Sequence, residues 1–418
     1  MRLRIQPREK GGCLPVFRAQ RGQPSLRYSV SFCGFAFILI LILISRPGRT
    51  DELDHLVVRL GKTVRITASY NYCWFPTVHQ FPTGEILATM RTSPDETNPE
   101  GEFSAYCISK DGGKTWSRRY PLGAGGNIDE AYSQVPLDGG IWALGAGYLS
   151  LEPFPPNQKI DFHVTLTRFS QAGMDIHQIR DAKIHLSEPA KFEPVELYAT
   201  KTPDASRLGT VPSPQPFGAI IGGPGREWLT TLMYTTEGDQ HRLVLLRSLD
   251  DGHTWNEGAT IAAVQPQNRP DWMGDGWPGE PGFVRLSENR LYMIFRTGDY
   301  MGETWSSDDG KTWSPAVSTG LKGVAPHLRL MSNGLLACTF GRPGPVAIMF
   351  SSNEGKKWAA ITPIFRGKSS AYTDVIEVEP GKLFVVFDSS PEGGNPLPDT
   401  GTFPEHSIYG TFLEVQKR

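Results

Sequence analysis

Short apolar runs separated by polar turns recur along most of the chain. Leu243–Leu246 and Val346–Phe350 are typical, because they are long enough for β-strands and too short for ordinary helices. Several runs follow a turn in which Pro or an acidic residue precedes Gly, as at Pro82–Gly84 and Glu379–Gly381. Turns of this composition join antiparallel strands into hairpins. The pattern therefore predicts an all-β protein.

An eight-residue phrase, S-x-D-x-G-x-T-W, occurs in three intact copies and one altered copy: Ser109–Trp116, Ser248–Trp255, Ser306–Trp313 and Ser351–Trp358. Its Asp and Ser/Thr side chains can hydrogen-bond nearby backbone groups, its Gly can adopt a positive φ, and its Trp can bury a large ring. Each copy predicts a tight turn at the tip of a hairpin. Because the phrase repeats, its Asp is predicted to be structural rather than catalytic or metal-binding.

The spacing of the copies predicts the architecture. The second and third copies begin 58 positions apart and the third and fourth begin 45 apart, which leaves room for one four-stranded sheet in each interval. The 139 positions from Ser109 to Ser248 hold a further unit, whose diverged turn is predicted at Val164–Gly173. The opening strands at His55–Leu60 and Val64–Ala68 are expected to help close a ring. Residues 51–418 are therefore predicted to form a six-bladed β-propeller.

The first 50 residues differ from the rest of the chain. They carry nine Lys/Arg and one acidic residue, and an apolar run spans residues 30–44. A basic stretch followed by an apolar segment is typical of an export signal. The apolar run is short for a membrane span, yet no small-residue cleavage site follows it. The leader predicts export, either as a secreted or periplasmic protein or with a membrane tether through residues 30–44.

The charge of the remaining chain limits the choice of partner. Residues 51–418 hold 33 Lys/Arg and 43 Asp/Glu, and this acidic balance argues against a nucleic-acid partner. Three of the five cysteines lie beyond the leader, without the spacing of a disulfide framework or a zinc site. No metal-binding or nucleotide-binding motif occurs, so neither a metal nor a cofactor is predicted.

The boxed turns and the hairpin turns together resemble the Asp-box, or BNR, repeats of the sialidase (neuraminidase) superfamily, over about residues 60 to 415. The resemblance implies a six-bladed propeller whose boxed turns lie away from the substrate pocket. Functional residues are then expected at the mouth of the central channel.

The resemblance also implies roles for individual residues. Ser370–Val375 is similar to the segment that bears the tyrosine nucleophile, and Gly279–Pro281 to the strand that bears its glutamate partner. The site residues implied in this way are Tyr372 as nucleophile, Glu280 as its base, Asp95 as acid/base, Arg296 and Arg342 as carboxylate-binding arginines, and Arg91 as a substrate ligand beside Asp95.

These residue types suit the chemistry. A tyrosine hydroxyl is a weak nucleophile at neutral pH unless a neighbouring carboxylate takes its proton. A neutral nucleophile also avoids repulsion by a carboxylate on the substrate. The planar fork of arginine binds such a carboxylate through two hydrogen bonds.

One position departs from the family pattern. The first clamp arginine is expected within Cys73–Pro76, where this chain has Trp74. The loss of one bidentate ion pair weakens the case for sialic acid, while an indole can stack on a sugar ring.

Three functions therefore stay open. The first is an exported sialidase-like glycoside hydrolase that acts on acidic or modified terminal sugars. The second is a carbohydrate-binding propeller without turnover, and the third is a membrane-tethered interaction scaffold. His327 and the Asp129–Glu130 pair are candidate pocket residues, for which a structural role is favoured.

Overall fold

The computed structural model describes residues 56–69, 73–92, 104–121, 131–145, 161–170, 175–196, 208–212, 214–223, 225–389 and 406–417. All of them belong to the unit Thr50–Arg418. The predicted leader, with its apolar segment 30–44, lies outside the described residues. Among the helices of the described residues, none is long and apolar enough to cross a membrane.

The described chain is built from β-strands, as the apolar pattern predicts, with two short 3₁₀ turns, η3 (Pro266–Asn268) and η4 (Asp271–Met273). Four separate sheets contain four strands each. The first sheet consists of β2 (Cys73–Gln80), β3 (Ile86–Thr92), β4 (Ser104–Ser109) and β5 (Tyr120–Pro121), and the second of β16 (Gly279–Ser287), β17 (Arg290–Arg296), β18 (Tyr300–Ser306) and β19 (Val317–Lys322). The third sheet consists of β20 (Val324–Leu330), β21 (Leu336–Gly341), β22 (Val346–Ser351) and β23 (Ala359–Phe365). The fourth consists of β24 (Thr373–Glu379), β25 (Lys382–Ser389), β26 (His406–Lys417) and β1 (Leu56–Ser69).

Eight more strands form two antiparallel sets of four. They are β6 (Ala131–Ser133), β7 (Gly140–Gly145), β8 (Asp161–Ser170) and β9 (Asp175–His185), then β12 (Gln215–Gly222), β13 (Trp228–Thr235), β14 (His241–Ser248) and β15 (Thr254–Val264). Short parallel pairings join β6 to β12 and β9 to β15. A separate hairpin consists of β10 (Phe192–Glu196) and β11 (Leu208–Pro212). Repeated four-stranded sets of this kind are the blades of a β-propeller, and the count of six stays a prediction.

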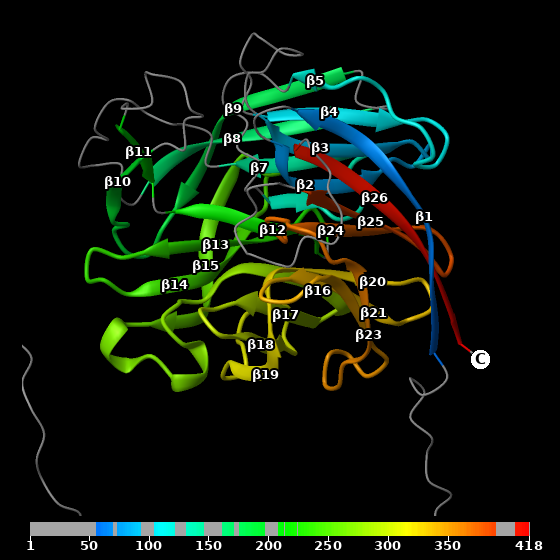
Figure 1. Cartoon of the computed structure of the whole chain (residues 1–418). Helices are drawn as coiled ribbons and strands as arrows, with labels where there is room; N and C mark the ends of the chain where they lie inside the picture. The colour runs from blue at the N-terminus through cyan, green and yellow to red at the C-terminus, as the bar shows by residue number, and fades with distance from the viewer. Residues whose placement is uncertain are drawn as a thin grey trace, which may run out of the picture. The chain divides into compact units, whose positions relative to one another are not determined.

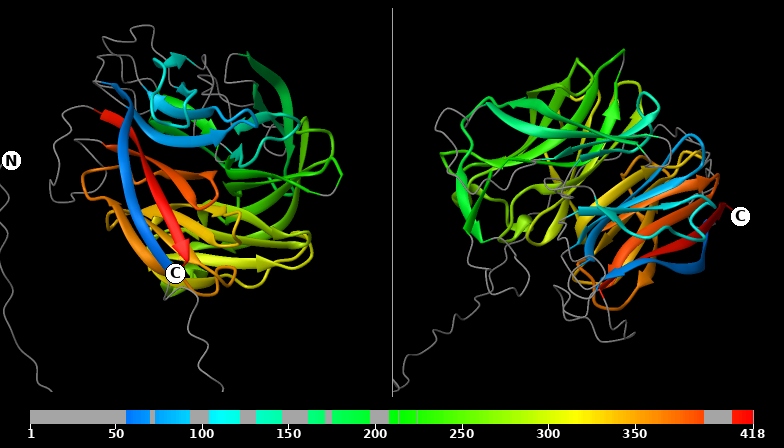
Figure 2. Two further views of the ribbon diagram at one scale, coloured as in Figure 1. Left: turned by 90° about the vertical axis from the view of Figure 1, so that its right-hand side faces the viewer. Right: turned by 90° about the horizontal axis from the view of Figure 1, so that it is seen from above.

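The two ends of the described chain pair with each other. β1 runs antiparallel to β26, with Leu56 opposite Lys417 and Ser69 opposite His406 (Figures 1 and 2). The strand from the start of the chain thus completes the sheet made by its end. This agrees with the closing role predicted for the opening segment, and it covers a sheet edge that could otherwise pair with another chain.

The boxed turns adopt one hydrogen-bonded structure. In the first copy, Ser109 Oγ donates to Asp111 Oδ1 at 2.8 Å and accepts from Gly113 N at 2.8 Å, while Thr115 N donates to Asp111 Oδ1 at 2.9 Å. Gly113 has a φ of +90°, which a side chain would strain. The hydrogen bonds from Thr115 are the main cause that lowers the pKa of Asp111 to about 2. The altered fourth copy keeps the same bonds through Asn353.

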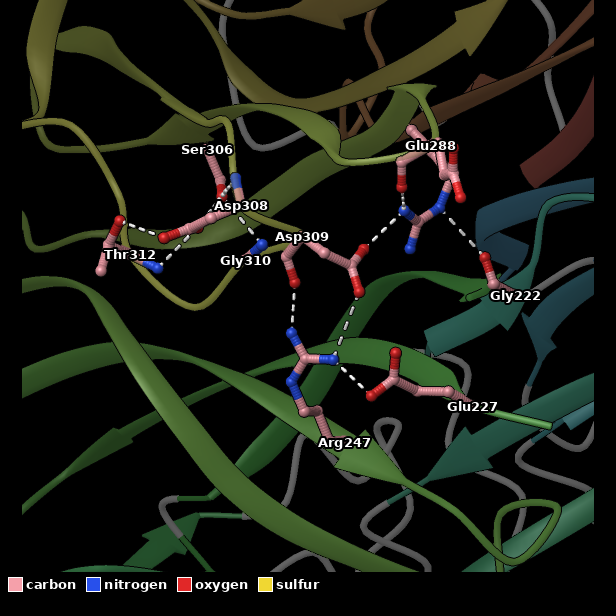
Figure 3. Close-up of polar contacts among 10 residues, drawn as sticks. Gly222, Glu227, Arg247, Glu288, Ser306, Asp308, Asp309, Gly310 and Thr312 are labelled. Atoms are coloured by element: carbon pink, nitrogen blue, oxygen red, sulfur yellow. Dashed lines mark hydrogen bonds and ion pairs between the residues drawn. The ribbon is translucent and has the colours of Figure 1, made fainter. Parts of the chain in front are cut away.

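In the third box, the residue after the box Asp links two sheets. Asp309, in the third copy, accepts from Arg285 Nη1 at 2.5 Å within its own sheet, and its Oδ2 lies 3.5 Å from Arg247 Nη1 of β14 (Figure 3). Arg247 also binds Glu227 and the backbone carbonyl of Asp309 (Figure 3). Since the Asp309 side chain is only 11% exposed, this network is a partly buried link between two neighbouring sheets.

We predict that Asp309→Ala lowers the free energy of unfolding by about 2–4 kcal/mol, because it leaves two partly buried guanidinium groups without their shared carboxylate. Chemical denaturation measures this change. Asp251→Ala is the matched control: Asp251 occupies the same place in the second copy, but its partner Arg226 is 77% exposed. That control should cost less than about 1 kcal/mol. Equal losses from the two variants would contradict the proposed link.

Candidate active site

The inner strands all begin at one end of the sheets, and the second strands end there. Register pairs Trp74 with Arg91 and Gly279 with Arg296 at this end. The boxed turns lie at the opposite end, since the box serine Ser306 pairs with Leu291, the residue next to the start of β17. The structure therefore separates the boxes from the end that carries the predicted site residues.

Tyr372, Glu280 and Arg296 meet at this end. The Tyr372 hydroxyl donates to Glu280 Oε1 at 2.5 Å, and Arg296 Nη1 donates to the same oxygen at 2.7 Å. The tyrosine precedes β24, the glutamate is the second residue of β16, and the arginine ends β17. A phenol and a guanidinium thus share one carboxylate oxygen. This arrangement allows Glu280 to take a proton from Tyr372.

Register explains why these side chains meet. Four residues of the inner strands stand at one level of the sheets: Val78, Phe283, Leu328 and Val375. The residue three positions before each of them is, in the same order, Phe75, Glu280, Ala325 and Tyr372. Glu280 and Tyr372 are therefore at one height around the channel, with the small Ala325 on the strand between them. Glu280 is the one ionisable carboxylate among these four positions.

The backbone is strained at this level. Phe75, Glu280 and Ala325 have φ values of 53°, 44° and 43°, and each precedes a proline. Irregular pairing follows in all three strands, as between Gly279 and Gly282. Positive φ in residues other than Gly costs energy, and such strain is common at functional sites. The same irregularity therefore recurs before a proline in three of the inner strands.

The charges at the site are arranged to keep Arg296 protonated. Burial works against its charge, but the Glu280 carboxylate and the Tyr372 hydroxyl outweigh that cost and raise the pKa of Arg296. The Glu280 side chain is 14% exposed, and its Oε2 makes no hydrogen bond to any described residue. Oε1 of Glu280 thus accepts hydrogen bonds from both Tyr372 and Arg296, while Oε2 accepts none from a described residue.

A second Tyr–Glu pair shows what is particular to this site. In the core of the second sheet, the Tyr292 hydroxyl donates to Glu303 Oε2 at 2.8 Å. Tyr292 is fully buried and no substrate could reach it. A Tyr–Glu hydrogen bond alone therefore does not define a site. Tyr372 differs in its partial exposure, its arginine neighbour and its place at the strand ends.

A buried carboxylate holds the segment that carries Tyr372. Asp388 Oδ1 accepts from the hydroxyls of Ser370 at 2.7 Å and Ser369 at 3.0 Å, and Asp388 Oδ2 accepts from Ser370 N at 2.9 Å. Burial raises the pKa of Asp388, and these hydrogen bonds oppose part of the rise. Asp388 thereby fixes a turn in which Ala371 has a φ of 69°. Sequence reasoning missed this residue, because nothing local to Asp388 marks it.

Two other predicted residues, Arg342 and Arg91, lie at the ends of second strands near this centre. Arg342 follows β21, and its neighbour Gly341 packs so closely on Ala371 that an added Cβ would lie 2.3 Å from the Ala371 Cβ. The Nε of Arg342 is buried and makes no hydrogen bond to any described residue. Arg91 pairs in register with Trp74. Asp95, the predicted acid, lies outside the described residues, as do Asp129 and Glu130.

Trp74 stands at the site as an aromatic neighbour. Its Nε1 donates to His406 Nδ1 at 3.3 Å, and its ring lies edge-on to Phe75 at 5.8 Å. Phe75 in turn lies edge-on to the Tyr372 ring at 4.3 Å between centroids. The position expected to hold the first clamp arginine therefore begins a row of aromatic rings that ends at Tyr372.

A polar pocket continues along the channel below Tyr372. The inner strands β2, β6, β12, β16, β20 and β24 all line it, and its polar residues include His79, His327, Arg329 and Asp374. Asp374 accepts from Val78 N at 3.0 Å and from Val375 N at 2.7 Å, and it lies 3.3 Å from His327 Nδ1. Asp374 thus joins three inner strands. Within the described residues no cluster of His, Cys, Asp and Glu has the geometry of a metal site.

His79 is a buried histidine of the pocket. Burial is the main cause that lowers its pKa to about 4, with His327 and Arg329 lowering it further and Asp374 opposing them. Its Nε2 lies 2.9 Å from Thr77 Oγ1, and its ring stacks on Tyr132 at 4.8 Å. His79 is therefore neutral at pH 7. Sequence reasoning missed it, because a single His within a strand gives no local signal.

Comparisons with known proteins agree with this architecture. Residues 220–385 match the family model described as a BNR repeat-like domain. A protein of unknown function from Dyadobacter fermentans has a similar structure, with 20% identity, a TM-score of 0.61 and coverage of 86% of this chain and 99% of that one. The chain has no significant match among curated proteins.

Two glycosidase structures are also similar. The Hadza microbial sialidase Hz136 has 15% identity and a TM-score of 0.55, over 84% of this chain and 66% of that chain. The α-L-arabinofuranosidase Arb93A of Fusarium graminearum has 12% identity and a TM-score of 0.54, over 85% and 98%. The chain thus shares its fold with proteins that include these two glycosidases, and its residues 220–385 match a BNR repeat-like domain.

We predict that acidification destabilises the protein through His79. The pKa of His79 in the fold is below its ordinary value of 6.5, so the unfolded chain binds the proton first and stability falls as the pH drops from about 6.5 to about 4. The loss attributable to His79 approaches about 3 kcal/mol at the lower limit. Urea unfolding of the wild type and His79→Gln at pH 7 and pH 4.5 measures it. His253→Gln, at an exposed box histidine, is the control; a pH dependence unchanged in His79→Gln would contradict the assignment.

We also predict that Asp388→Ala loosens the Tyr372 segment. The amide of Ser370 loses its acceptor, so hydrogen exchange at Ser370 and Ala371 should accelerate by at least about tenfold. Exchange within β25 away from residue 388 should change much less. Asp250→Ala, in a box at the opposite end, serves as the control. Unchanged exchange at Ser370 would show that Asp388 does not hold this turn.

Proposed function

We propose that this protein is an exported, sialidase-like glycoside hydrolase that removes acidic or modified terminal sugars. The observation that carries the proposal is the hydrogen bond of 2.5 Å from Tyr372 to Glu280, with Arg296 on the same carboxylate oxygen. The two residues are 92 positions apart and lie at the starts of strands in different sheets, so the arrangement of the sheets brings them together. We take that arrangement to be a ring of six blades, because six inner strands line one pocket.

The proposed reaction has two steps. Tyr372 Oη attacks the anomeric carbon while Glu280 takes the phenolic proton, and the bond to the leaving oxygen breaks as Asp95 protonates that oxygen. Water then attacks the anomeric carbon of the aryl glycoside formed with Tyr372, and Asp95 takes the water proton. The bond from that carbon to Tyr372 Oη breaks as Glu280 returns its proton to the phenolate oxygen. Two displacements at one carbon retain the anomeric configuration.

The arginines suit an anionic substrate. Arg296 ends β17 of the second sheet, Arg342 follows β21 of the third sheet, and Arg91 lies in β3 of the first sheet. A carboxylate bound there would compete with Glu280 for Arg296 and would leave the glutamate freer to accept the tyrosine proton. Trp74 in place of an arginine removes one ion pair, which favours a substrate other than an unmodified sialoside.

A second function has support from Trp74. A row of aromatic rings at the site can bind a sugar by stacking, without any turnover. In that case the protein would be a carbohydrate-binding propeller. The basic leader supports export for either function, with residues 30–44 as a signal or as a membrane tether.

A panel of fluorogenic aryl glycosides, including an α-sialoside, a β-glucuronide and an α-L-arabinofuranoside, tests the proposal. We expect hydrolysis of an acidic member, and a loss of at least about a hundredfold in kcat for Tyr372→Phe and for Glu280→Gln. Tyr120→Phe removes a hydroxyl on an outer strand and should retain activity.

A fluorinated derivative of the hydrolysed sugar should label Tyr372, as detected by mass spectrometry of the peptide. Full activity of Tyr372→Phe, or inversion of the anomeric configuration, would overturn the mechanism. Glycan binding that survives Tyr372→Phe, with no hydrolysis of any substrate, would instead support the second function.

A further inference from the structure

Trp277 is a large apolar side chain displayed beside the candidate site. It is 51% exposed, although its neighbours Pro278 and Gly279 are buried. It lies three residues before Glu280, in the connection from β15 to β16. This connection is at the same end as Tyr372, because β16 begins there. An indole kept half in water at this place has no role in the core.

One face of the indole is covered and the other is available. The ring of His241 stacks on Trp277 with 4.6 Å between centroids and 13° between planes. His241 is itself held, since its Nδ1 lies 2.9 Å from Thr235 Oγ1. With one face on the imidazole and half of its surface exposed, Trp277 presents its other face to solvent as a flat platform.

The segment that carries Trp277 is firmly fixed. Met273 is buried, and its carbonyl accepts from Gly298 N at 2.8 Å. Arg269 Nη1 donates to the carbonyls of Asp275 at 2.7 Å and Gly276 at 3.0 Å. Gly276 packs so tightly that an added Cβ would lie 2.1 Å from Gly298 N. The platform is therefore preorganised, and ligand binding would not have to order it.

The platform adjoins the Glu280–Arg296 side of the site. An added Cβ on Gly279 would lie 3.8 Å from Trp277 Cδ1, and Gly279 is the register partner of Arg296. Gly298, on which the segment packs, follows Arg296 by two positions. The row of Trp74 and Phe75 flanks the opposite, Tyr372 side. The two aromatic groups thus border the candidate site from different sheets.

We propose that Trp277 forms a second sugar subsite, which stacks on the ring next to the terminal sugar, so that the substrates are oligosaccharides or glycan chains rather than single glycosides. This inference rests on the proposed function for its terminal-sugar pocket. The exposed indole face matches the apolar C–H face of a sugar ring in shape and in polarity. Its stacking needs no particular hydroxyl pattern, so the second sugar is recognised as a ring rather than as one named sugar.

The test compares substrates of two lengths. For wild type and Trp277→Ala, kcat/KM is measured on 4-methylumbelliferyl sialoside and on sialyllactose, or on the corresponding aryl glycoside and trisaccharide of the sugar that the panel identifies. We expect the oligosaccharide-to-monosaccharide ratio of kcat/KM to fall roughly tenfold, through KM. Trp277→Phe should restore most of the ratio, because it keeps an aromatic face. Leu249→Ala, at an exposed apolar residue in a box, is the control. An unchanged ratio in Trp277→Ala would overturn the subsite.

A binding measurement separates this inference from the proposed function. The same proteins, each also carrying Tyr372→Phe, are applied to an array of mono- and oligosaccharide glycans. If no substrate is hydrolysed, the proposed function fails, yet oligosaccharide binding that is lost in Trp277→Ala still supports the subsite. Equal binding by both proteins, or no glycan binding by either, overturns it.

Discussion

The pairing of β1 with β26 is the contact on which the rest of the structure depends. It joins the start of the described chain to its end, and so places the first sheet beside the last. Two interactions at the candidate site cross this junction: Phe75 against the Tyr372 ring, and Val78 N on the Asp374 carboxylate. The closure therefore places the partners of both interactions next to each other.

The end of the sheets that carries the boxes differs in structure from the end that carries the candidate site. At one end, the boxes satisfy their own backbone groups through Ser, Asp and Gly, and residues such as Asp309 link neighbouring sheets. At the other end, positive φ values at Phe75, Glu280 and Ala325 strain the strands. This is the usual relation between a scaffold and a site built on it.

The aromatic and charged residues at the open end form a consistent surface. Tyr372 and Glu280 face each other across Ala325, whose small side chain leaves the space between their strands open. Arginines end the neighbouring strands, and indoles border the centre on two sides. Asp388 and Asp374 lie on either side of Tyr372 in the last sheet, and both are held by backbone amides. Asp388 thus fixes the residues before Tyr372, and Asp374 fixes the residues after it.

The sequence by itself determined the all-β class and the box turns, because short apolar runs and Asp-box phrases are local signals carried by neighbouring residues. It also singled out Tyr372, Glu280 and Arg296, through the resemblance of their flanking segments. Only the tertiary structure decided that Asp388 holds the tyrosine turn, that His79 and Asp374 share the channel, and that Trp277 stacks on His241. These contacts join residues that are distant along the chain, and their geometry follows from register and closure, which no local pattern encodes.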